Sequence, residues 1–341
     1  MRPTGAEGHA CPICARTLRV LDGILVDSAL PAMANLLEEI DYDARHGVSR
    51  AASANLGDHW WRLLQQEFGE RDDLELLEIG AGSGLLTLGL ATRGRFGRLY
   101  VSDVSRVFLA ANRRTAFESG ADAAAHVTWL ASSVDDLPFR SGTLDVVVGN
   151  SVLHHIYDYR GALAALARLL RPGGVAILGE PVLQGKVYVG LLARMVREFD
   201  MRQPSPRFSA DEHRLLRDLA TLCRREFWRT AAEIERETAN DKHLFDLEEI
   251  RVLAPTLGFA VVEARPWKVI DDGFLAEFHG SLRIMGIREE PLAAYRFLFE
   301  IVQQQMVSQL GASVPTAFAH LILRKERDLR RAQGAAVSIG G

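Results

Sequence analysis

The stretch LLEIGAGSGLL, residues 76–86, decides the fold. An apolar run ends at Glu78, three alternate glycines follow, and a helical pattern begins at Leu85. Glycines let the backbone turn sharply and let a ligand approach where a Cβ atom would collide. The pattern is typical of a buried strand that passes through a ligand-binding turn into a helix. The alternative is a plain strand-to-helix turn, but three glycines in five residues after an acid argue against it.

Short apolar runs alternate with helical stretches from residue 73 to residue 181. The predicted strands are 74–80, 98–103, 126–132, 143–149 and 173–180, and the predicted helices include 105–119 and 160–171. Strands that alternate with helices form right-handed crossovers and a parallel sheet with helices on both faces. With further strands at 260–264 and 316–325, we expect an α/β fold: a doubly wound, mostly parallel seven-stranded sheet with helical lid insertions.

Composition and pattern divide the chain into five segments. These are an N-terminal CxxC hairpin and helical cap (1–72), a ligand-binding core (73–181), a helical lid insertion (182–244), the C-terminal part of the core (245–330) with a second helical insertion at 267–314, and a disordered tail (331–341). The dipeptide Asp22-Gly23 between two short apolar runs predicts a hairpin over residues 17–27. Ser209 and Glu212 form a capping-box pattern that predicts the start of a lid helix.

The composition is that of a soluble globular protein. The 341 residues are 48% hydrophobic and 25% charged, and the net charge is −4. This balance argues against a protein that coats nucleic acid, and no apolar run approaches the roughly 20 residues that a membrane span needs. The N-terminus lacks a secretory pattern, and three cysteines fit a reducing compartment. We expect a cytoplasmic enzyme or binding protein, and the oligomeric state stays open.

Two ligand classes compete for the glycine turn. A dinucleotide site has the spacing G-x-G-x-x-G, whereas this turn has G-x-G-x-G with Leu85 at the place of the third glycine. Glu78 would repel a pyrophosphate, but it can hold an ammonium group directly or through water. Asp103 ends the next strand, 19 residues after Gly84, where a carboxylate accepts hydrogen bonds from ribose hydroxyls. An adenosine ribose joined to a cationic amino acid describes S-adenosylmethionine.

At these residues the sequence resembles the class I S-adenosylmethionine-dependent methyltransferases, which have a Rossmann-like fold. The resemblance covers residues 73–181 well and 245–325 loosely. Besides the glycine turn and its acid, it rests on the segments SSVDDLPF (132–139), LDVVVGN (144–150) and LRPGG (170–174). In the family an acid meets the adenine amino group in the first of these segments, and here Ser133 stands at that place.

The resemblance implies S-adenosyl-L-methionine as the cofactor. It also implies a set of cofactor-binding residues: Glu78, Gly80, Gly82, Gly84, Asp103, Val104, Ser133, Val134 and Asn150. The backbone N–H of Val134 is expected to meet adenine N1.

Methyl transfer is an in-line displacement that sometimes needs a base to take a proton from the acceptor. His154 and His155 follow the fourth strand at the edge of the expected pocket, and imidazole titrates near neutral pH. We therefore predict that one or both are catalytic, while the alternative is that one histidine packs beneath the cofactor. Weaker candidates are Tyr42, His46, Tyr157, Tyr159, Glu180 and His243.

The pair Cys11 and Cys14 precedes the predicted hairpin and resembles half of a zinc ribbon. Structural zinc needs four ligands, usually from two such pairs, and the sequence holds no second CxxC. Cys223, the third cysteine, lies in a predicted helix. We therefore predict no metal site and an ordinary hairpin. Some bacterial ribosomal RNA guanine methyltransferases carry a complete zinc module at this place, from which this chain departs.

The leading hypothesis is a methyltransferase that acts on a small-molecule acceptor, such as a secondary metabolite, within a pocket formed by the helical insertions. Aromatic residues crowd these insertions and their borders, although helix–helix packing also accounts for them. They are Trp228, Phe245, Trp267, Phe274, Phe278, Tyr295, Phe297 and Phe299. The alternatives are an RNA base methyltransferase, which would need a contiguous basic face, and a non-catalytic protein that binds S-adenosylmethionine as a partner subunit.

Overall fold

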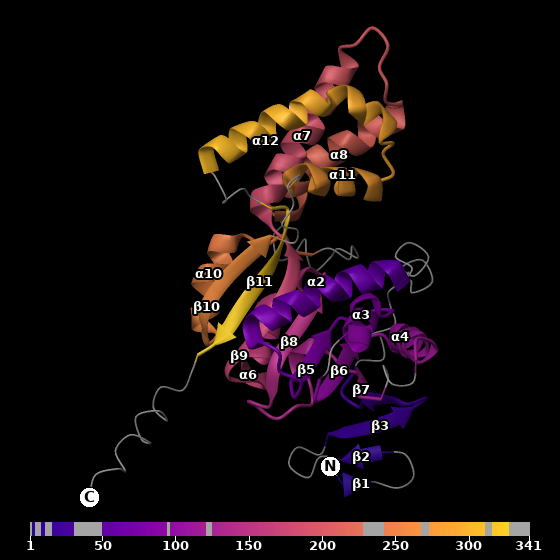
Figure 1. Cartoon of the computed structure of the whole chain (residues 1–341), viewed down its shortest axis with the longest axis vertical. Coiled ribbons are helices and arrows are strands. Elements are labelled where there is room, and N and C mark those ends of the chain that lie inside the picture. Colours follow the sequence, from indigo (N-terminus) through magenta and orange to yellow (C-terminus); the bar gives the residue numbers. More distant parts are fainter. Residues whose placement is uncertain are drawn as a thin grey trace, which may run out of the picture.

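One continuous sheet organises the protein (Figure 1). The computed structural model describes residues 2–3, 8–10, 16–30, 50–93, 96–120, 125–227, 242–266, 273–310 and 316–326. Within these residues, eleven strands pair in the order β1-β2-β3-β4-β7-β6-β5-β8-β9-β11-β10. The expected α/β class and the mostly parallel, doubly wound sheet are confirmed, and the strand count is higher than the seven predicted.

Seven strands make up the doubly wound part of the sheet. They are β5 (Glu75–Ile79), β6 (Arg98–Asp103), β7 (Val127–Ala131), β8 (Leu144–Asn150), β9 (Leu170–Pro181), β10 (Phe259–Pro266) and β11 (Phe318–Lys325). Strands β5 to β9 run parallel, and β11 is antiparallel to its neighbours β9 and β10. The chain winds from β5 outward to β7 and then returns to pair β8 with the other side of β5. Such a reversal opens a crevice at the carboxyl ends of the strands.

The N-terminal segment adds four strands to the sheet. They are β1 (Arg2–Pro3), β2 (Gly8–Ala10), β3 (Thr17–Leu21) and β4 (Ile24–Asp27). The predicted hairpin forms between β3 and β4, with positive φ at both Asp22 and Gly23. Strand β4 then pairs in parallel with β7, with Leu25 opposite Leu130. The hairpin therefore satisfies backbone groups of β7 that would otherwise form an open sheet edge.

Helices cover both faces of the sheet. On one face lie α2 (Arg50–Phe68), α3 (Leu85–Arg93) and α4 (Arg106–Glu118), and on the other lie α6 (Tyr159–Leu169) and α10 (Leu247–Thr256). Strand β8 shows why both faces are apolar. Val146 and Val148 pack into the core beneath α2, α3 and α4, and Val147 between them packs into the core beneath α6 and α10. A strand buried on both faces is a continuous apolar run, as the sequence shows.

Four helices form a separate unit, here called the lid helices: α7 (Leu183–Met201), α8 (Ala210–Phe227), α11 (Gly273–Ile284) and α12 (Arg296–Leu310). Figure 1 shows them gathered beyond the carboxyl end of β9. They share a hydrophobic core of their own, in which the tilted rings of Phe278 and Phe299 have their centroids 4.7 Å apart. Tyr295 belongs to the same core, whereas Phe297 is exposed. Helix packing therefore accounts for Phe278, Tyr295 and Phe299.

The two segments that leave the sheet, here called the lid excursions, are residues 182–244 and 267–314. In each of them the two ends lie close together. Val182, at the start of the first excursion, bridges Phe245 at its end. Pro266, before the second excursion, lies opposite Ala319 in the pairing of β10 with β11. The two ends of each excursion therefore lie next to each other.

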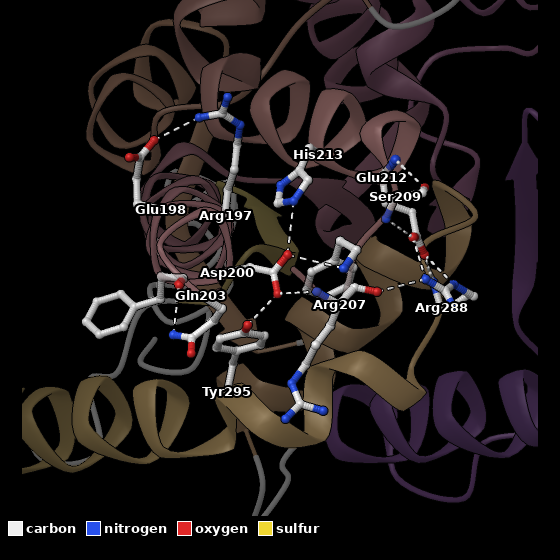
Figure 2. Close-up of polar contacts among 12 residues, drawn as sticks. Arg197, Glu198, Asp200, Gln203, Arg207, Ser209, Glu212, His213, Arg288 and Tyr295 are labelled. Carbon is white, nitrogen blue, oxygen red and sulfur yellow. Dashed lines mark hydrogen bonds and ion pairs between the residues drawn. The ribbon is translucent and has the colours of Figure 1, made fainter. Parts of the chain in front are cut away.

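A buried carboxylate, Asp200, ties the lid helices together (Figure 2). It accepts hydrogen bonds from the N–H groups of Arg207 and Phe208, at 2.8 and 3.1 Å, and from the Tyr295 hydroxyl. His213 Nε2 on α8 lies 3.0 Å from the same carboxylate. Burial raises the pKa of Asp200, but these donors outweigh it and hold the pKa below its usual range. One side chain therefore joins α7, α8 and the turn before α12.

The predicted capping box forms at the start of α8. Ser209 N–H donates to Glu212 Oε2 at 2.8 Å, and Glu212 N–H donates to Ser209 Oγ at 3.2 Å. Arg288 also pairs with Glu212, and its hydrogen bonds lower the Glu212 pKa to about 2.

Several expectations lie outside the described residues. They concern Cys11, Cys14, Tyr42, His46, Trp228, Trp267, the Phe274 and Cys223 side chains, and the tail 331–341. In the part of the chain that is described, no helix is long and apolar enough to cross a membrane. The same part holds no cluster of three or more metal-ligating side chains.

Helices α2 and α3 cross in close contact through two glycines, which gives a stability prediction. A Cβ atom at Gly89 would collide with the Ser53 carbonyl and with Gly57. We expect Gly89→Ala to lower the free energy of unfolding by about 1–3 kcal/mol in urea titrations, because the helices must separate. The control is Gly280→Ala in α11, where a Cβ meets nothing within 4 Å. That change should raise stability by about 0.5–1 kcal/mol. Equal effects of the two substitutions would contradict the close crossing.

Candidate functional site

A cavity of about 390 Å³ lies at the carboxyl ends of β5, β6, β7 and β8. Its wall comes from the turns that follow these four strands: residues within 79–82, 102–104, 132–135 and 151–156, together with Phe108 and Lys242. The crevice that the winding of the sheet creates is therefore a defined pocket. None of the described residues of the lid helices lines it.

The glycine turn forms one wall, and two of its glycines serve different needs. Gly80 has φ 58° and faces Val152, whose side chain occupies the place that a Cβ would take. Gly82 has φ 51° and faces open space at the cavity. The first glycine thus lets the turn after β8 approach β5, and the second leaves room for a ligand beside the backbone.

Asp103, at the end of β6, is held by the backbone on both sides. Its Oδ2 accepts a hydrogen bond from Gly82 N–H at 2.8 Å, and its Oδ1 accepts one from Ser105 N–H at 2.8 Å. Ser105 also caps α4, since its hydroxyl accepts a hydrogen bond from Phe108 N–H. The carboxylate is therefore fixed at the cavity wall, between the glycine turn and the start of a helix.

The segment after β7 supplies a second acid to the wall. Ser133 donates a hydrogen bond from its hydroxyl to Asp135 Oδ2 at 3.3 Å. Val134 begins the short 3-10 helix η2 (Val134–Asp136). Burial raises the pKa of Asp135, with smaller contributions from Asp158 and Asp136 in the same direction. Ser133, Val134 and Asp135 all line the cavity.

The turn after β8 is anchored by Glu180 of β9, which is fully buried. Its carboxylate accepts hydrogen bonds from three consecutive N–H groups, those of Val152, Leu153 and His154, at 3.1, 2.7 and 3.3 Å. Ser151, just before them, has φ 58°, an uncommon conformation for a residue with a side chain. A single buried carboxylate therefore shapes this wall.

The two predicted histidines take different places. His155 lines the cavity, whereas His154 lies behind it, with its Nδ1 2.6 Å from Glu180 Oε2. A carboxylate at this distance favours a proton on Nδ1 and leaves Nε2 as the basic nitrogen. The two imidazole rings lie 4.0 Å apart.

The end of the first lid excursion closes over this turn. The N–H groups of Lys242 and His243 donate to the His154 carbonyl at 2.8 and 3.2 Å. His243 Nε2 lies 3.0 Å from the Tyr157 carbonyl, and burial lowers the pKa of His243. Lys242 thereby reaches the cavity wall, as the one described residue of 182–244 that does so.

A family model described as a methyltransferase domain matches residues 77–178. The match runs from β5 into β9 and includes the four strands whose ends form the cavity. This part of the chain is a class I S-adenosylmethionine-dependent methyltransferase domain. The methyltransferase domain thus coincides with the segment that carries the glycine turn, Asp103 and both histidines.

The chain is also similar to curated proteins. The chain is 32% identical over 120 residues to the reducing polyketide synthase Preu2 of Preussia isomera, covering 35% of this chain and 5% of that protein. It is 28% identical over 173 residues to the ubiquinone/menaquinone biosynthesis C-methyltransferase UbiE of Vibrio campbellii, covering 48% of this chain and 66% of that protein. The chain therefore spans only part of these relatives.

Among solved structures, the chain is similar to phosphoethanolamine N-methyltransferase 2 of Haemonchus contortus in complex with S-adenosyl-L-methionine. The identity is 16% and the TM-score 0.49, and the match covers 87% of this chain and 58% of that one.

Of the residues expected to bind cofactor in the methyltransferase domain, six line the cavity: Gly80, Gly82, Asp103, Val104, Ser133 and Val134. The other three are not among the residues that line it. Gly84 has φ 105° and packs against Asn112, and Glu78 is buried beneath the turn. Asn150 ends β8, and its Oδ1 is buried without a hydrogen-bond partner among the described residues.

These residues fit S-adenosylmethionine. A buried carbonyl oxygen without a partner, such as Asn150 Oδ1, needs a donor, and an ammonium group supplies one. The fixed carboxylate of Asp103 suits vicinal ribose hydroxyls, and Asp135 suits an amino group. When bound, the cofactor supplies an electrophilic methyl group.

Sequence reasoning missed Asp135 and underrated Glu180. The adenine acid was sought at residue 133, but the acid that lines the cavity stands two positions later, in the pair Asp135-Asp136. Glu180 is an acid at the end of an apolar strand, the same signal that drew attention to Glu78. Lys242 carried no local signal, because only the fold brings it to the wall.

Glu78 gives a prediction about pH. Its Oε2 accepts a hydrogen bond from Thr87 at 2.7 Å, yet burial dominates and raises the Glu78 pKa to about 8. A carboxyl group whose pKa is higher in the folded state stabilises the fold at low pH and loses that contribution as pH rises. The free energy of unfolding without ligand should therefore fall between about pH 4.5 and pH 8, by on the order of a few kcal/mol.

The test compares the wild type with Glu78→Gln in urea titrations at pH 5, 6, 7 and 8. Glutamine keeps an acceptor for Thr87 but does not titrate, so the variant should lack this decline. Parallel pH profiles of the two proteins would show that Glu78 titrates normally.

Proposed function

We propose that this chain transfers the methyl group of S-adenosylmethionine to a small-molecule acceptor. The observation that carries the proposal is the Asp103 carboxylate, fixed at the cavity by Gly82 N–H and Ser105 N–H. A preorganised carboxylate at the end of the second strand accepts hydrogen bonds from both ribose hydroxyls without further reorganisation. The matched family model supports the same assignment.

The proposed binding mode divides the cofactor among three walls. The glycine turn, with Glu78 beneath it and Asn150 beside it, takes the methionine part. Asp103 and Val104 take the ribose. Ser133, the N–H of Val134, and Asp135 take the adenine. Each wall follows a different strand, so the sheet fixes their separation.

His155 is the proposed base, because it lines the cavity beyond the adenosine walls. Its neighbour His154 is oriented by Glu180 and packs against its ring. When bound, S-adenosylmethionine would supply the methyl group, and His155 would accept the proton that the acceptor loses. The positive charge that leaves the sulfonium would then reside on the imidazolium of the histidine, and the thioether product would be neutral.

A histidine base assists methyl transfer only when the acceptor must lose a proton, as an acidic C–H group or a hydroxyl group does. The names of the similar proteins, a quinone-pathway C-methyltransferase and a polyketide synthase, support a small organic acceptor of this kind. An RNA acceptor would need a basic face at the cavity. Among the described residues that line it, Lys242 is the single lysine or arginine.

The first experiment is calorimetric titration of the purified chain with S-adenosylmethionine, S-adenosylhomocysteine and NAD⁺. Binding of the first two but not of the dinucleotide is expected. A panel of phenols, quinols and β-keto thioesters is then screened for release of S-adenosylhomocysteine. Binding without turnover on any acceptor would favour the partner-subunit alternative, and binding of NAD⁺ alone would refute the proposal.

Replacing the ribose acid tests the binding mode. Asp103→Ala removes two charge-assisted hydrogen bonds to the ribose and should cost about 2–4 kcal/mol of cofactor binding. Asp72→Ala, which removes an exposed acid before β5, is the matched control and should bind normally. Calorimetry that finds unchanged affinity in Asp103→Ala would move the ribose elsewhere.

Replacing the histidines tests the base. With an acceptor from the panel, His155→Ala should lower kcat by about 100-fold or more while the Kd for cofactor changes less than about threefold. His154→Ala should also lower kcat, because it removes the ring that orients His155. The control is His126→Ala, an exposed histidine before β7. Wild-type turnover in both site variants would exclude the pair from the mechanism.

A further inference from the structure

The N-terminal hairpin touches the part of the cavity proposed to hold adenine. Strand β4 runs parallel to β7, and its last paired residue, Val26, lies opposite Ala131. Asp27 therefore lies beside Ser132, the first residue after β7. Ser132 and the three residues that follow it all line the cavity. The sheet extension thus ends at the turn 132–136.

Asp27 is an ionised carboxylate inside this junction, only 3% exposed. The Ser132 hydroxyl donates to its Oδ2 at 2.9 Å, and Ala29 N–H donates to its Oδ1 at 3.0 Å. Arg16 Nε donates to Oδ1 at 2.8 Å, and Arg16 Nη2 pairs with Oδ2. Burial raises the Asp27 pKa, but these donors outweigh it and hold the pKa below its usual range.

Arg16 extends this contact to the far end of the turn. Its Nη1 lies 2.9 Å from Asp136 Oδ1, and its Nη2 donates to the Asp136 carbonyl. The Asp136 side chain is 71% exposed, so that ion pair alone is weak. The Arg16 side chain is only 14% exposed, and its planar fork binds both acids at once. One guanidinium group therefore spans from β4 to the last residue of η2.

The turn also has contacts that do not involve the hairpin: Ser132 N–H donates to the Asp103 carbonyl at 3.1 Å, and the Ser133 hydroxyl donates to Asp135 Oδ2 at 3.3 Å. No side chain caps η2, and within the turn Asp136 N–H reaches the Ser133 carbonyl at 3.3 Å. Arg168 binds the carbonyls of Leu137 and Phe139, beyond the residues that line the cavity. Asp27 and Arg16 therefore add side-chain contacts at the two ends of the turn, Ser132 and Asp136.

We propose that Arg16 and Asp27 are positioning residues that preorganise the turn 132–136 for recognition of the adenine amino group. The proposal rests on the proposed use of S-adenosylmethionine. Asp27 fixes Ser132, and Arg16 fixes Asp136, so Ser133, Val134 and Asp135 between them are presented in one conformation. Without the pair, the turn must be ordered when the nucleoside binds, and that ordering weakens binding.

The test uses two probes, S-adenosylhomocysteine and S-inosylhomocysteine, of which the second has a carbonyl in place of the purine amino group and a proton on N1. Calorimetry gives both Kd values for the wild type, Arg16→Gln, Arg16→Lys and Asp27→Asn. Arg19→Gln, which removes an exposed arginine of the same hairpin, is the matched control. Thermal unfolding of every variant reports its stability separately.

We expect Arg16→Gln and Asp27→Asn to bind S-adenosylhomocysteine about tenfold more weakly, with little change for the inosyl compound. The ratio of the Kd for S-inosylhomocysteine to the Kd for S-adenosylhomocysteine should fall toward one. Arg16→Lys should lie between, because an ammonium group cannot span both acids. Arg19→Gln should keep the wild-type ratio.

The failures are distinguishable. A wild type that binds neither probe refutes the proposed function and this inference with it. If the wild type prefers S-adenosylhomocysteine and the variants keep its Kd values, the inference alone is wrong. Equal weakening of both probes in step with lower thermal stability would show a structural contribution only. Because Arg16 is partly exposed, its glutamine variant can rehydrate and fold even where Asp27→Asn does not.

Discussion

The site depends on one carboxylate bound by two backbone N–H groups. Asp103 accepts hydrogen bonds from Gly82 and Ser105, and so links the turn after β5 to the start of α4. These two N–H groups belong to segments that meet only because β5 and β6 are parallel neighbours. An anion fixed by donors from two elements is oriented before any ligand arrives, which is the condition for strong electrostatic recognition.

A second carboxylate has the matching task on the opposite wall. Glu180 of β9 fixes the turn after β8, as Asp103 of β6 fixes the turn after β5. Both acids stand at strand ends, and both accept hydrogen bonds from backbone N–H groups. The difference lies in burial, because Glu180 is sealed behind the wall and Asp103 lines the cavity. One therefore shapes the site, and the other is placed to meet a ligand.

Local patterns predicted whatever depends on local chemistry. The glycine turn, the strands on either side of it and the capping box at Ser209 each follow from side chains a few residues apart. The pairing of β4 with β7 was not predictable in this way, since Leu25 and Leu130 meet only through the sheet. The same reason separates His154 from His155: the sequence places both at the pocket, and the contact with Glu180 decides which one faces it. Asp135 was missed because the family pattern directed attention two positions earlier.

The paired ends of the two helical excursions affect how this fold can change in evolution. Val182 touches Phe245 and Pro266 lies opposite Ala319, so each excursion is a loop whose ends are already held together by the sheet. Lengthening such a loop costs little chain entropy, since closure is set by neighbouring strands. The helices also carry their own apolar interior and lend no described residue to the pocket wall. A descendant of this gene can therefore exchange the helices for others and keep the pocket wall, provided that it keeps the segment from Lys242 to Phe245.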